Sequence, residues 1–307
     1  MPTARPPFFK RLKRLVRYAL VRTALALLGL LPLSWASGLG AALGGLGFHL
    51  ARGERRRALA SLAVAFPELP EAERLRLARA CFRHLGRTAL ELVCIDAVDA
   101  RLETVVEWPP EARAVLDAAL SRNKGVVFVS GHLGNWELLA RRVALAGYPC
   151  QTIAREASDP RTTRLIERFR ASGRLKTIWR GHPRAVRDML KALRGGEILG
   201  LLIDQDTRVQ SVWVPFFGRP AKTPRAAADL ALRTGAATVL GFCQRAAPGR
   251  YRVTMREVPH PGGDRDQAAL ELTARLTRGI EDAIRAQPEQ WVWMHQRWKS
   301  PPEPPSA

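Results

Sequence analysis

The stretch Val126–Leu139, "VVFVSGHLGNWELL", decides the fold class of this chain. It begins with an apolar, β-branched run of the kind that forms a buried strand. A glycine and a histidine follow, and after a short polar turn a helical pattern begins at Trp136. In sheets built from such strand–turn–helix units, ligands bind beyond the carboxyl ends of the strands. His132 is therefore expected to face a ligand-binding cleft.

The same alternation continues to the end of the chain. We predict strands at Val126–Val129, Thr152–Ala154, Lys176–Trp179, Ile198–Ile203, Ala237–Phe242 and Tyr251–Val258, and helices at Trp136–Ala146, Thr162–Ala171, Pro183–Leu193, Pro224–Arg233 and Gln267–Ala286. Strands that alternate with helices indicate an α/β fold with a mostly parallel central sheet flanked by helices.

The N-terminal part of the sequence indicates a membrane-associated helical segment. A basic stretch precedes an uncharged run, Thr23–Ala51, and a second basic cluster, Arg52–Arg57, follows it. The run is long enough to span a bilayer, but Pro32, with Ser34 as an N-cap, is expected to divide it into two helices. Since both flanks are basic, two short helices embedded from the cytoplasmic face fit better than a span or a signal peptide. The alternative to membrane association is a helical hairpin buried within a soluble protein.

Composition narrows the class of partner without choosing one. The formal net charge of +21 attracts nucleic acid, anionic lipid or an acidic protein. We expect no nucleic-acid partner because no nucleic-acid-binding signature is present. A basic nucleic-acid-binding protein is the alternative function that the charge leaves open. The four cysteines form no CxxC pair, which favours a reducing cytoplasmic compartment, and the histidines lack the spacing of zinc ligands.

The motif around His132 suggests a general base. Gly134 permits a turn that would bring Glu137 beside the imidazole, holding one ring nitrogen as N–H. The other nitrogen could then take a proton from a substrate hydroxyl, and the activated hydroxyl could attack a thioester directly. A lone pair of this kind also occurs by chance, so the motif needs its context.

That context resembles a known family. "HLGNWE" is similar to the HxxxxE motif of the late acyltransferases of lipid A biosynthesis, the lauroyl/myristoyl transferases within the lysophospholipid and glycerolphosphate acyltransferase group. Further blocks follow the family's order, namely "RRRALASLAVAFPEL", with Ser61 where an Asn is usual, then "AREASDP", "DQD", "VPFFGRPAKT" and "PEQWVWMHQRWK". The resemblance covers nearly the whole chain.

The resemblance implies transfer of an acyl chain from acyl carrier protein to a hydroxyl of a membrane glycolipid, most directly the lipid A precursor. It implies a glycerolphosphate-acyltransferase-like fold, no cofactor and no metal, and a location at the inner (cytoplasmic) membrane with the catalytic domain facing the cytoplasm. By this resemblance His132 is the base and Glu137 its partner. The implied substrate-binding residues are Asn135, Arg155, Asp204, Asp206 and Arg297. Arg155 would bind acceptor phosphate or stabilise the thioester oxyanion, and Arg297 would contact acceptor phosphate. The two aspartates would border the same cleft.

Two surface features leave alternatives open. Basic residues recur from Arg155 to Arg194, either as a solvated face or as the contact for a membrane surface, the glycolipid and acyl carrier protein. The aromatic residues form two clusters that either line an acyl-chain groove or pack in the core. Their members are Trp213, Phe216, Phe217, Trp291, Trp293 and Trp298.

We expect three parts: a basic membrane-associated segment at 1–57, the α/β acyltransferase domain at 58–299, and a disordered proline-rich tail at 300–307. The donor could also be coenzyme A, and the acceptor a mannosylated phosphoinositide or a lysophospholipid. A hydrolase is disfavoured because no GxSxG motif is present.

Overall fold

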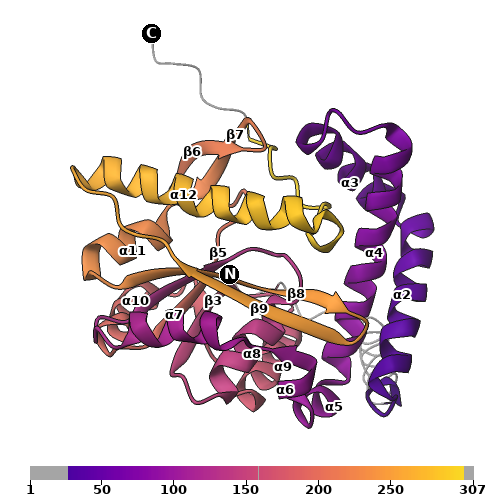
Figure 1. The fold of residues 1–307 in the computed structure, drawn as a ribbon, viewed down its shortest axis with the longest axis horizontal. Helices are drawn as coiled ribbons and strands as arrows, with labels where there is room; N and C mark the ends of the chain where they lie inside the picture. Colours follow the sequence, from indigo (N-terminus) through magenta and orange to yellow (C-terminus); the bar gives the residue numbers. More distant parts are fainter. Residues whose placement is uncertain (1–26, 158, 301–307) are drawn as a thin grey trace, which may run out of the picture.

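The structure is a computed structural model that describes residues 27–157 and 159–300. Its centre is a seven-stranded sheet with the order β1-β9-β8-β2-β5-β3-β4 (Figure 1). The strands are β1 (Val106–Glu107), β2 (Val126–Ser130), β3 (Cys150–Arg155), β4 (Lys176–Arg180), β5 (Ile198–Leu202), β8 (Ala237–Ala247) and β9 (Arg250–Glu257). Only the β8–β9 pair is antiparallel, so the predicted mostly parallel sheet is confirmed.

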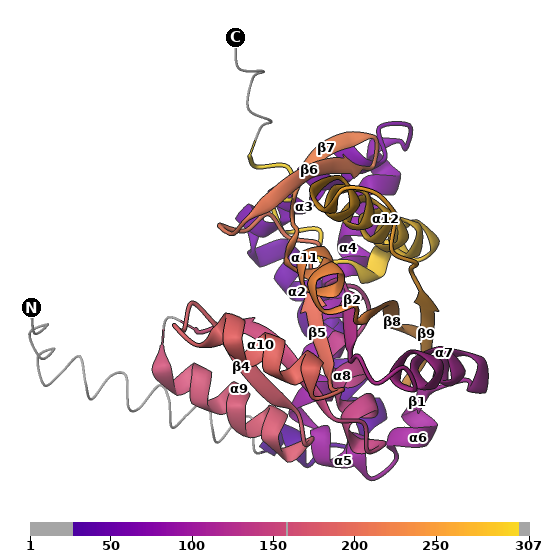
Figure 2. The same cartoon turned by 90° about the vertical axis from the view of Figure 1, so that its left-hand side faces the viewer.

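Helices cover both faces of this sheet (Figures 1 and 2). One face carries α7 (Pro110–Leu120), α8 (Trp136–Leu145) and α9 (Pro160–Ser172), and the other carries α10 (Ala185–Arg194), α11 (Ala226–Thr234) and α12 (Arg265–Ala286). The alternation of side chains along β2 explains this division, because successive residues of a strand point to opposite faces. Val126 and Phe128 pack in the core with α7 and α8, whereas Val127 and Val129 pack with α11 and α12.

The remaining elements frame the sheet. A helical layer is formed by α2 (Leu33–Leu50), α3 (Arg52–Ala65) and α4 (Glu71–Val93), and the short helices α5 (Ile95–Asp99) and α6 (Leu102–Val105) lead into β1. A separate antiparallel hairpin, β6 (Ser211–Phe216) and β7 (Arg219–Pro224), was not predicted. Three prolines in this hairpin hide the strand pattern, since proline is tolerated only in edge strands. The 3₁₀ turn η1 (Pro288–Gln290) follows α12.

The N-terminal segment differs in part from the expectation. The chain breaks at Pro32 as predicted, but Pro32 itself is the N-cap of α2, so the assignment of Ser34 as N-cap was wrong. Ser34 is the second residue of the helix and therefore lies past the N-cap position. Among the described helices, none is long and apolar enough to cross a membrane. Residues 1–26 and 301–307, with most of the predicted basic stretch and tail, lie outside the described residues.

Glycines bring α2 and α4 into close contact. A Cβ atom on Gly40 would lie 2.4 Å from the carbonyl oxygen of Gly86, and one on Gly44 would lie 2.1 Å from the carbonyl oxygen of Phe82. Only glycine permits this approach of two helix backbones. The glycine-rich sequence of α2 is thus a packing surface for α4, and the opposite face of α2 remains exposed.

This contact predicts a large difference between two adjacent glycines. Gly44→Ala is expected to destabilise the protein by about 1–3 kcal/mol, because the added methyl group meets backbone that cannot yield. Gly45→Ala is the matched control, since its Cβ would make only ordinary contact with the Arg83 side chain. It should stabilise the helix by about 0.5–1 kcal/mol. Denaturation midpoints in detergent measure both, and equal midpoints would contradict the proposed packing.

Candidate active site

The pairing of two strands brings a histidine and an aspartate together. His132 follows β2 and Asp204 follows β5, and these strands are parallel neighbours, paired from Val126–Ile198 to Ser130–Leu202. Their carboxyl ends therefore meet at one edge of the sheet. There the Nδ1 atom of His132 lies 2.8 Å from Oδ1 of Asp204, and the backbone N–H of His132 donates to Oδ2 at 2.7 Å.

Asp204 is buried and held from three directions. Its side chain also accepts a hydrogen bond of 2.8 Å from the indole N–H of Trp291. Burial alone would raise the pKa of Asp204, but the His132 ring charge and the hydrogen bonds from His132 and Trp291 outweigh it and hold this pKa well below its usual range. The carboxylate is thus ionised at neutral pH. It keeps Nδ1 of His132 as a donor and leaves Nε2 as the basic nitrogen.

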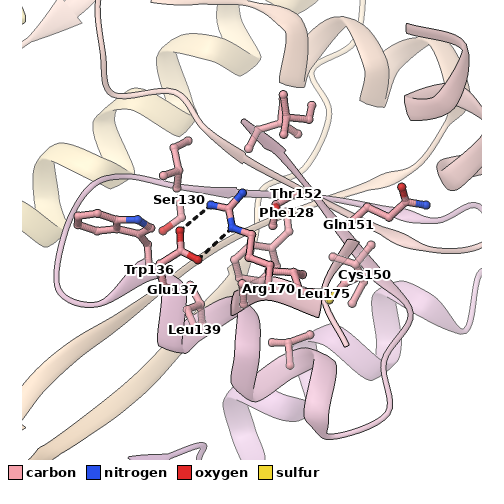
Figure 3. Close-up of a pocket in the computed structure, with 17 residues that line it drawn as sticks. Phe128, Ser130, Trp136, Glu137, Leu139, Cys150, Gln151, Thr152, Arg170 and Leu175 are labelled. Carbon is pink, nitrogen blue, oxygen red and sulfur yellow. Dashed lines mark hydrogen bonds and ion pairs between the residues drawn. The ribbon is translucent and has the colours of Figure 1, made fainter. Parts of the chain in front are cut away.

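Glu137 does not fill the place predicted for it. Its carboxylate forms a two-pronged ion pair with Arg170 of α9, at 2.6 Å for Oε1–Nη2 and 3.1 Å for Oε2–Nε (Figure 3). The imidazole contacts Asp204 instead, so the expected Glu137–His132 contact is corrected. The physical reason is direction: Glu137 lies in the first turn of α8 and points under the sheet toward α9. The Trp136 ring packs edge-on against His132, with ring centroids 4.9 Å apart.

A glutamine and a second histidine complete the site, and the sequence did not single them out. Nε2 of Gln205 lies 3.2 Å from Nε2 of His132 and 2.8 Å from Nδ1 of His295. Burial, followed by the charge of His132, lowers the pKa of His295 to about 4, so His295 is neutral at pH 7. Ser61, where the family usually has Asn, donates to the backbone oxygen of His295. The block "PEQWVWMHQRWK" was the only available signal for this histidine.

The other predicted site residues are distributed unevenly. Arg155 is exposed at the carboxyl end of β3, two strands from β2 in the sheet. Asn135 is fully buried and caps α8, accepting from the backbone N–H of Leu138 at 3.1 Å. Asp206 is also buried and accepts from the backbone N–H of Ser300. Of these three, only Arg155 presents its side chain to solvent.

Arg297 lies in the interior. Its side chain is 1 % exposed, donates to the backbone oxygen of Lys222 and to the hydroxyl of Thr223, and lies over the Phe216 ring. Burial lowers its pKa to about 10, which leaves it charged at neutral pH. This position does not fit the predicted contact with acceptor phosphate. Arg297 instead fastens the C-terminal segment to β7.

An apolar pocket begins at Trp136, whose ring packs against His132, and runs under the sheet between β2, β3 and β5 on one side and α8 and α9 on the other (Figure 3). At the carboxyl ends of the strands it is lined by Trp136, Glu137 and Leu202, and at their amino ends by Cys150 and Ile198. The aromatic clusters do not line it. Phe216, Phe217, Trp291 and Trp293 are buried in the core, which confirms the packing interpretation for these four residues.

The described residues hold no group of three or more His, Cys, Asp and Glu side chains arranged to bind a metal ion. The chemistry that the visible groups can support is proton transfer at His132 beside an apolar pocket.

Comparison with known proteins identifies the family. Residues 5–300 match the family model described as bacterial lipid A biosynthesis acyltransferase. The chain belongs to this family. The resemblance seen in the sequence blocks is thereby confirmed.

Characterised relatives agree with this assignment. The lipid A biosynthesis lauroyltransferase of Escherichia coli K12 is 28% identical over 275 residues, covering 86% of this chain and 85% of that protein. The palmitoleoyltransferase of the same organism is 29% identical over 261 residues, covering 81% and 80%. A phosphatidylinositol mannoside acyltransferase of Mycobacterium tuberculosis is 25% identical over 185 residues, covering 60% and 57%.

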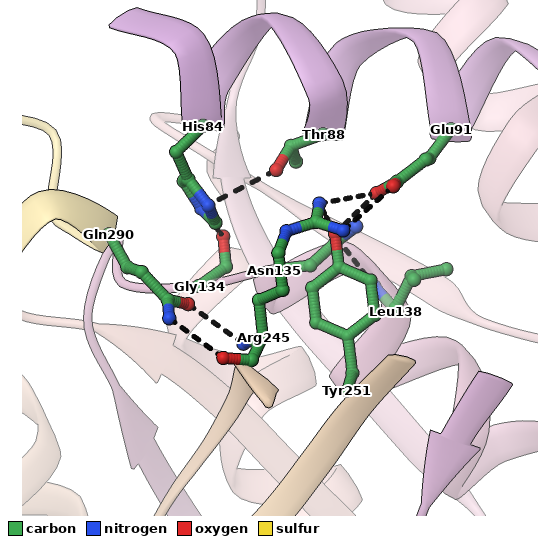
Figure 4. Close-up of polar contacts among 9 residues, drawn as sticks. All are labelled: His84, Thr88, Glu91, Gly134, Asn135, Leu138, Arg245, Tyr251 and Gln290. Carbon is green, nitrogen blue, oxygen red and sulfur yellow. Dashed lines mark hydrogen bonds and ion pairs between the residues drawn. The ribbon is translucent and has the colours of Figure 1, made fainter. Parts of the chain in front are cut away.

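In this acyltransferase, a buried polar network holds the turn that carries the histidine (Figure 4). Gly134 has φ of +64°, and a Cβ there would lie 2.1 Å from the carbonyl oxygen of Cys243, which confirms the need for glycine in the turn. Nε2–H of His84 donates to the backbone oxygen of Gly134 at 3.2 Å.

A buried ion pair lies beside this contact. Glu91 of α4 is 1 % exposed and receives two hydrogen bonds from Arg245 of β8, at 2.8 and 2.7 Å, and one from the Tyr251 hydroxyl (Figure 4). Helix α4 is therefore joined both to the turn that carries His132 and to the sheet.

His84 makes stability depend on pH. Burial, followed by the nearby Arg245 charge, lowers the pKa of His84 to about 4, whereas an unfolded histidine titrates near 6.5. Below pH 6.5 the unfolded chain binds a proton that the folded protein excludes, so the contribution present above pH 6.5 is lost as the pH falls toward 4. From pH 7.5 to 5 this amounts to roughly 2 kcal/mol.

Unfolding free energies of wild type and His84→Gln at several pH values between 7.5 and 5 measure this contribution. The variant should lose less stability than wild type on acidification, whereas His182→Gln, at an exposed position, should follow wild type. Parallel curves for wild type and His84→Gln would show that His84 is not the group responsible.

Proposed function

We propose that this protein is an O-acyltransferase that moves a fatty acyl chain from the thioester of acyl carrier protein to a hydroxyl of a membrane glycolipid, the lipid A precursor. The observation that carries the proposal is the His132–Asp204 pair, whose imidazole packs against Trp136, a residue that lines an apolar pocket. A base beside an apolar pocket suits a substrate that combines a hydroxyl, a thioester and a long acyl chain.

The reaction needs one base and no covalent enzyme intermediate. Nε2 of His132 takes the proton of the acceptor hydroxyl as its oxygen attacks the thioester carbonyl. The tetrahedral oxyanion collapses, the C–S bond breaks, and the imidazolium returns the proton to the departing thiolate. The Asp204 carboxylate stabilises the imidazolium while it exists. An acceptor hydroxyl at Nε2 replaces the Gln205 contact, and the Gln205 amide remains with His295.

The apolar pocket is the proposed site of the acyl chain. It follows β5 along its length, from Leu202 to Ile198, which corresponds to about 13 Å of extended strand. The Glu137–Arg170 ion pair lines this pocket and connects α8 to α9. We therefore assign Glu137 to positioning the pocket wall and α8, and assign to Asp204 the role first predicted for Glu137.

Charge on the outer surface suits the anionic substrates. Exposed arginines lie along α9 and α10, which pack on either side of the edge strand β4, and they include Arg164, Arg168 and Arg187. We propose that acidic acyl carrier protein docks at this edge of the sheet. Arg155, exposed at the end of β3, is placed to contact acceptor phosphate or the oxyanion.

The exposed face of α2 is the proposed membrane contact. Trp35, Leu39, Leu43, Leu46 and Leu50 form an apolar stripe, each more than one third exposed. Arginines of the Arg52–Arg57 cluster follow the end of this helix. A helix packed on one face and apolar on the other lies in the plane of a membrane surface. We place it at the inner (cytoplasmic) membrane, with the catalytic domain facing the cytoplasm.

A second acceptor class has support from the comparisons. The similar mycobacterial protein is named a phosphatidylinositol mannoside acyltransferase, and its alignment covers 60% of this chain. A mannosylated phosphoinositide is therefore the alternative acceptor. Parallel assays with both acceptors and the same acyl donors distinguish them.

Mutations at the site test the mechanism. His132→Ala and Asp204→Asn should each lower kcat by about 10²–10⁴ with the lipid A precursor and lauroyl- or myristoyl-acyl carrier protein. Glu137→Gln should act mainly on the KM for the acyl donor, because Glu137 lines the pocket rather than touching the imidazole. Arg233→Gln, on the far side of the sheet from this pocket, is the matched surface control. Full activity of His132→Ala would refute the mechanism.

Two substitutions with opposite effects test the acyl pocket. Gly200→Ala adds a methyl group to the pocket wall, where it meets Thr152, and should favour a shorter acyl chain. Val143→Ala removes two methyl groups from the same pocket and should favour a longer chain. Each methylene is expected to shift the ratio of kcat/KM between lauroyl and myristoyl donors about fourfold. Unchanged ratios in both variants would place the acyl chain elsewhere.

A further inference from the structure

A second pocket lies at the start of α2, apart from the catalytic edge of the sheet. It is bounded by α2, the middle of α4, the α5–α6 segment and the turn between β8 and β9. These elements lie together at the lower end of the α2–α4 layer in Figure 1. The polar side chains that line it include Ser34, Ser37, Arg87, Arg101 and Arg250.

The three arginines bring positive charge to this pocket without a counter-charge. No aspartate or glutamate lines it. Within residues 27–157 and 159–300, no hydrogen bond or ion pair is formed by the side chains of Arg87, Arg101 or Arg250. The buried Arg245 contrasts with them, because it is fully paired with Glu91. Like charges gathered around one pocket favour the binding of an anion.

Ser37 gives an independent sign of a ligand. Its side chain lines the pocket and only 6 % of the residue is exposed, and within residues 27–157 and 159–300 its hydroxyl makes no hydrogen bond. Because the hydroxyl is not among the fully buried polar atoms that lack a partner, it reaches the open space of the pocket and is available to a ligand. The first turn of α2 adds to the donors, since its Pro32 N-cap provides no side-chain cap for the amides that follow. A hydroxyl, free amides and guanidinium groups together match a phosphate.

The position of the pocket specifies what carries that phosphate. It adjoins the exposed apolar stripe of α2, where the Trp35 side chain is 71 % exposed and Leu39 is 38 % exposed. Ser34 and Gly38 of the pocket are the sequence neighbours of these two residues. A molecule with apolar chains along the stripe and a phosphate at its end fits both surfaces.

We propose that this pocket binds the headgroup phosphate of an anionic phospholipid of the bilayer. The proposal rests on the proposed membrane contact of α2 and adds a specific site to it. Because the pocket lies on one flank of α2, a bound headgroup fixes the rotation of α2 about its own axis at the membrane. Helix α4, which α2 packs against and which contacts the catalytic turn through His84, is held with it.

Binding to vesicles tests the site. The double variant Arg101→Gln/Arg250→Gln removes two exposed charges from the pocket, and Arg233→Gln/Arg265→Gln removes two exposed charges from α11 and α12. Flotation with pure phosphatidylcholine vesicles measures apolar binding, and vesicles that also contain phosphatidylglycerol measure the anionic contribution. The pocket variant should lose the phosphatidylglycerol-dependent gain by about tenfold or more, and the control should remain within about twofold of wild type.

Ser34→Asp provides a second variant that preserves folding. A carboxylate in the first turn of a helix is favourable, so α2 is retained while the pocket acquires an internal anion. It should also lose the gain from phosphatidylglycerol. Equal losses in the pocket and control double variants would overturn the proposal, because they would show a response to net charge alone.

Two further experiments complete the test. The first distinguishes bilayer phospholipid from other sources of phosphate, and the second distinguishes failure of the pocket proposal from failure of the proposed function. If inorganic phosphate, or neutral vesicles carrying only the lipid A precursor, replaced phosphatidylglycerol fully, the assignment to bilayer phospholipid would be overturned. Acyl transfer in detergent, without a bilayer, should be equal in wild type and the pocket variant. Absence of transfer by wild type would contradict the proposed function, and the vesicle result would still decide the pocket.

Discussion

The hydrogen bond between His132 and Asp204 depends on the parallel pairing of β2 and β5. The two residues are far apart in the sequence and meet only because both strands end at the same edge of the sheet. The contact determines which ring nitrogen is basic, since the carboxylate holds Nδ1 as the donor. The indole N–H of Trp291 and the backbone N–H of His132 also donate hydrogen bonds to the Asp204 carboxylate. This edge of the sheet therefore sets the position of His132 and the ring nitrogen that donates to Asp204.

The turn between β2 and α8 separates His132 from Glu137, although the sequence motif predicted contact between them. His132 precedes the turn and stays at the edge of the sheet, whereas Glu137 follows it and turns under the sheet to Arg170. The side chains of Glu137 and Arg170 are 17 % and 12 % exposed, so both charges are largely removed from water. Removal of either partner would destabilise the protein, because the other charge would remain desolvated and unpaired. The motif thus joins His132 at the edge of the sheet to Glu137 in the wall of the pocket. Its spacing reflects the length of the turn rather than direct contact.

Helix α4 connects α2 to the candidate site. Gly86 of α4 contacts the backbone of α2, and the opposite side of α4 carries His84 and Glu91 toward the Gly134 turn and the sheet. Neither contact of α4 tolerates displacement. At the α2–α4 contact the two backbones touch without side chains that could adjust, and at His84 and Glu91 the buried polar groups must stay hydrogen-bonded. Helix α4 is therefore rigidly connected to α2 on one side and to the turn that carries His132 on the other.

The local pattern of the sequence determined the elements of the sheet and its flanking helices. Apolar β-branched runs such as Val126–Val129 and helical runs such as Gln267–Ala286 reappear as β2 and α12 with small shifts of their ends. The hairpin Ser211–Pro224 was not predicted from the sequence, because its prolines obscure the strand periodicity. The sequence also located His132 and the requirement for Gly134, since a strand end and a tight turn are local features.

Only the tertiary structure decided the partners of these residues. It assigned Asp204 rather than Glu137 to the imidazole, brought His295 and Gln205 beside it, and buried Arg297, because these relations depend on which strands and segments become neighbours. The pocket of Arg87, Arg101 and Arg250 has the same origin, since its residues come from three separate parts of the chain. Sequence periodicity reports which face of an element is apolar. It carries no information on which other element covers that face, and the chemistry of this site depends on those neighbours.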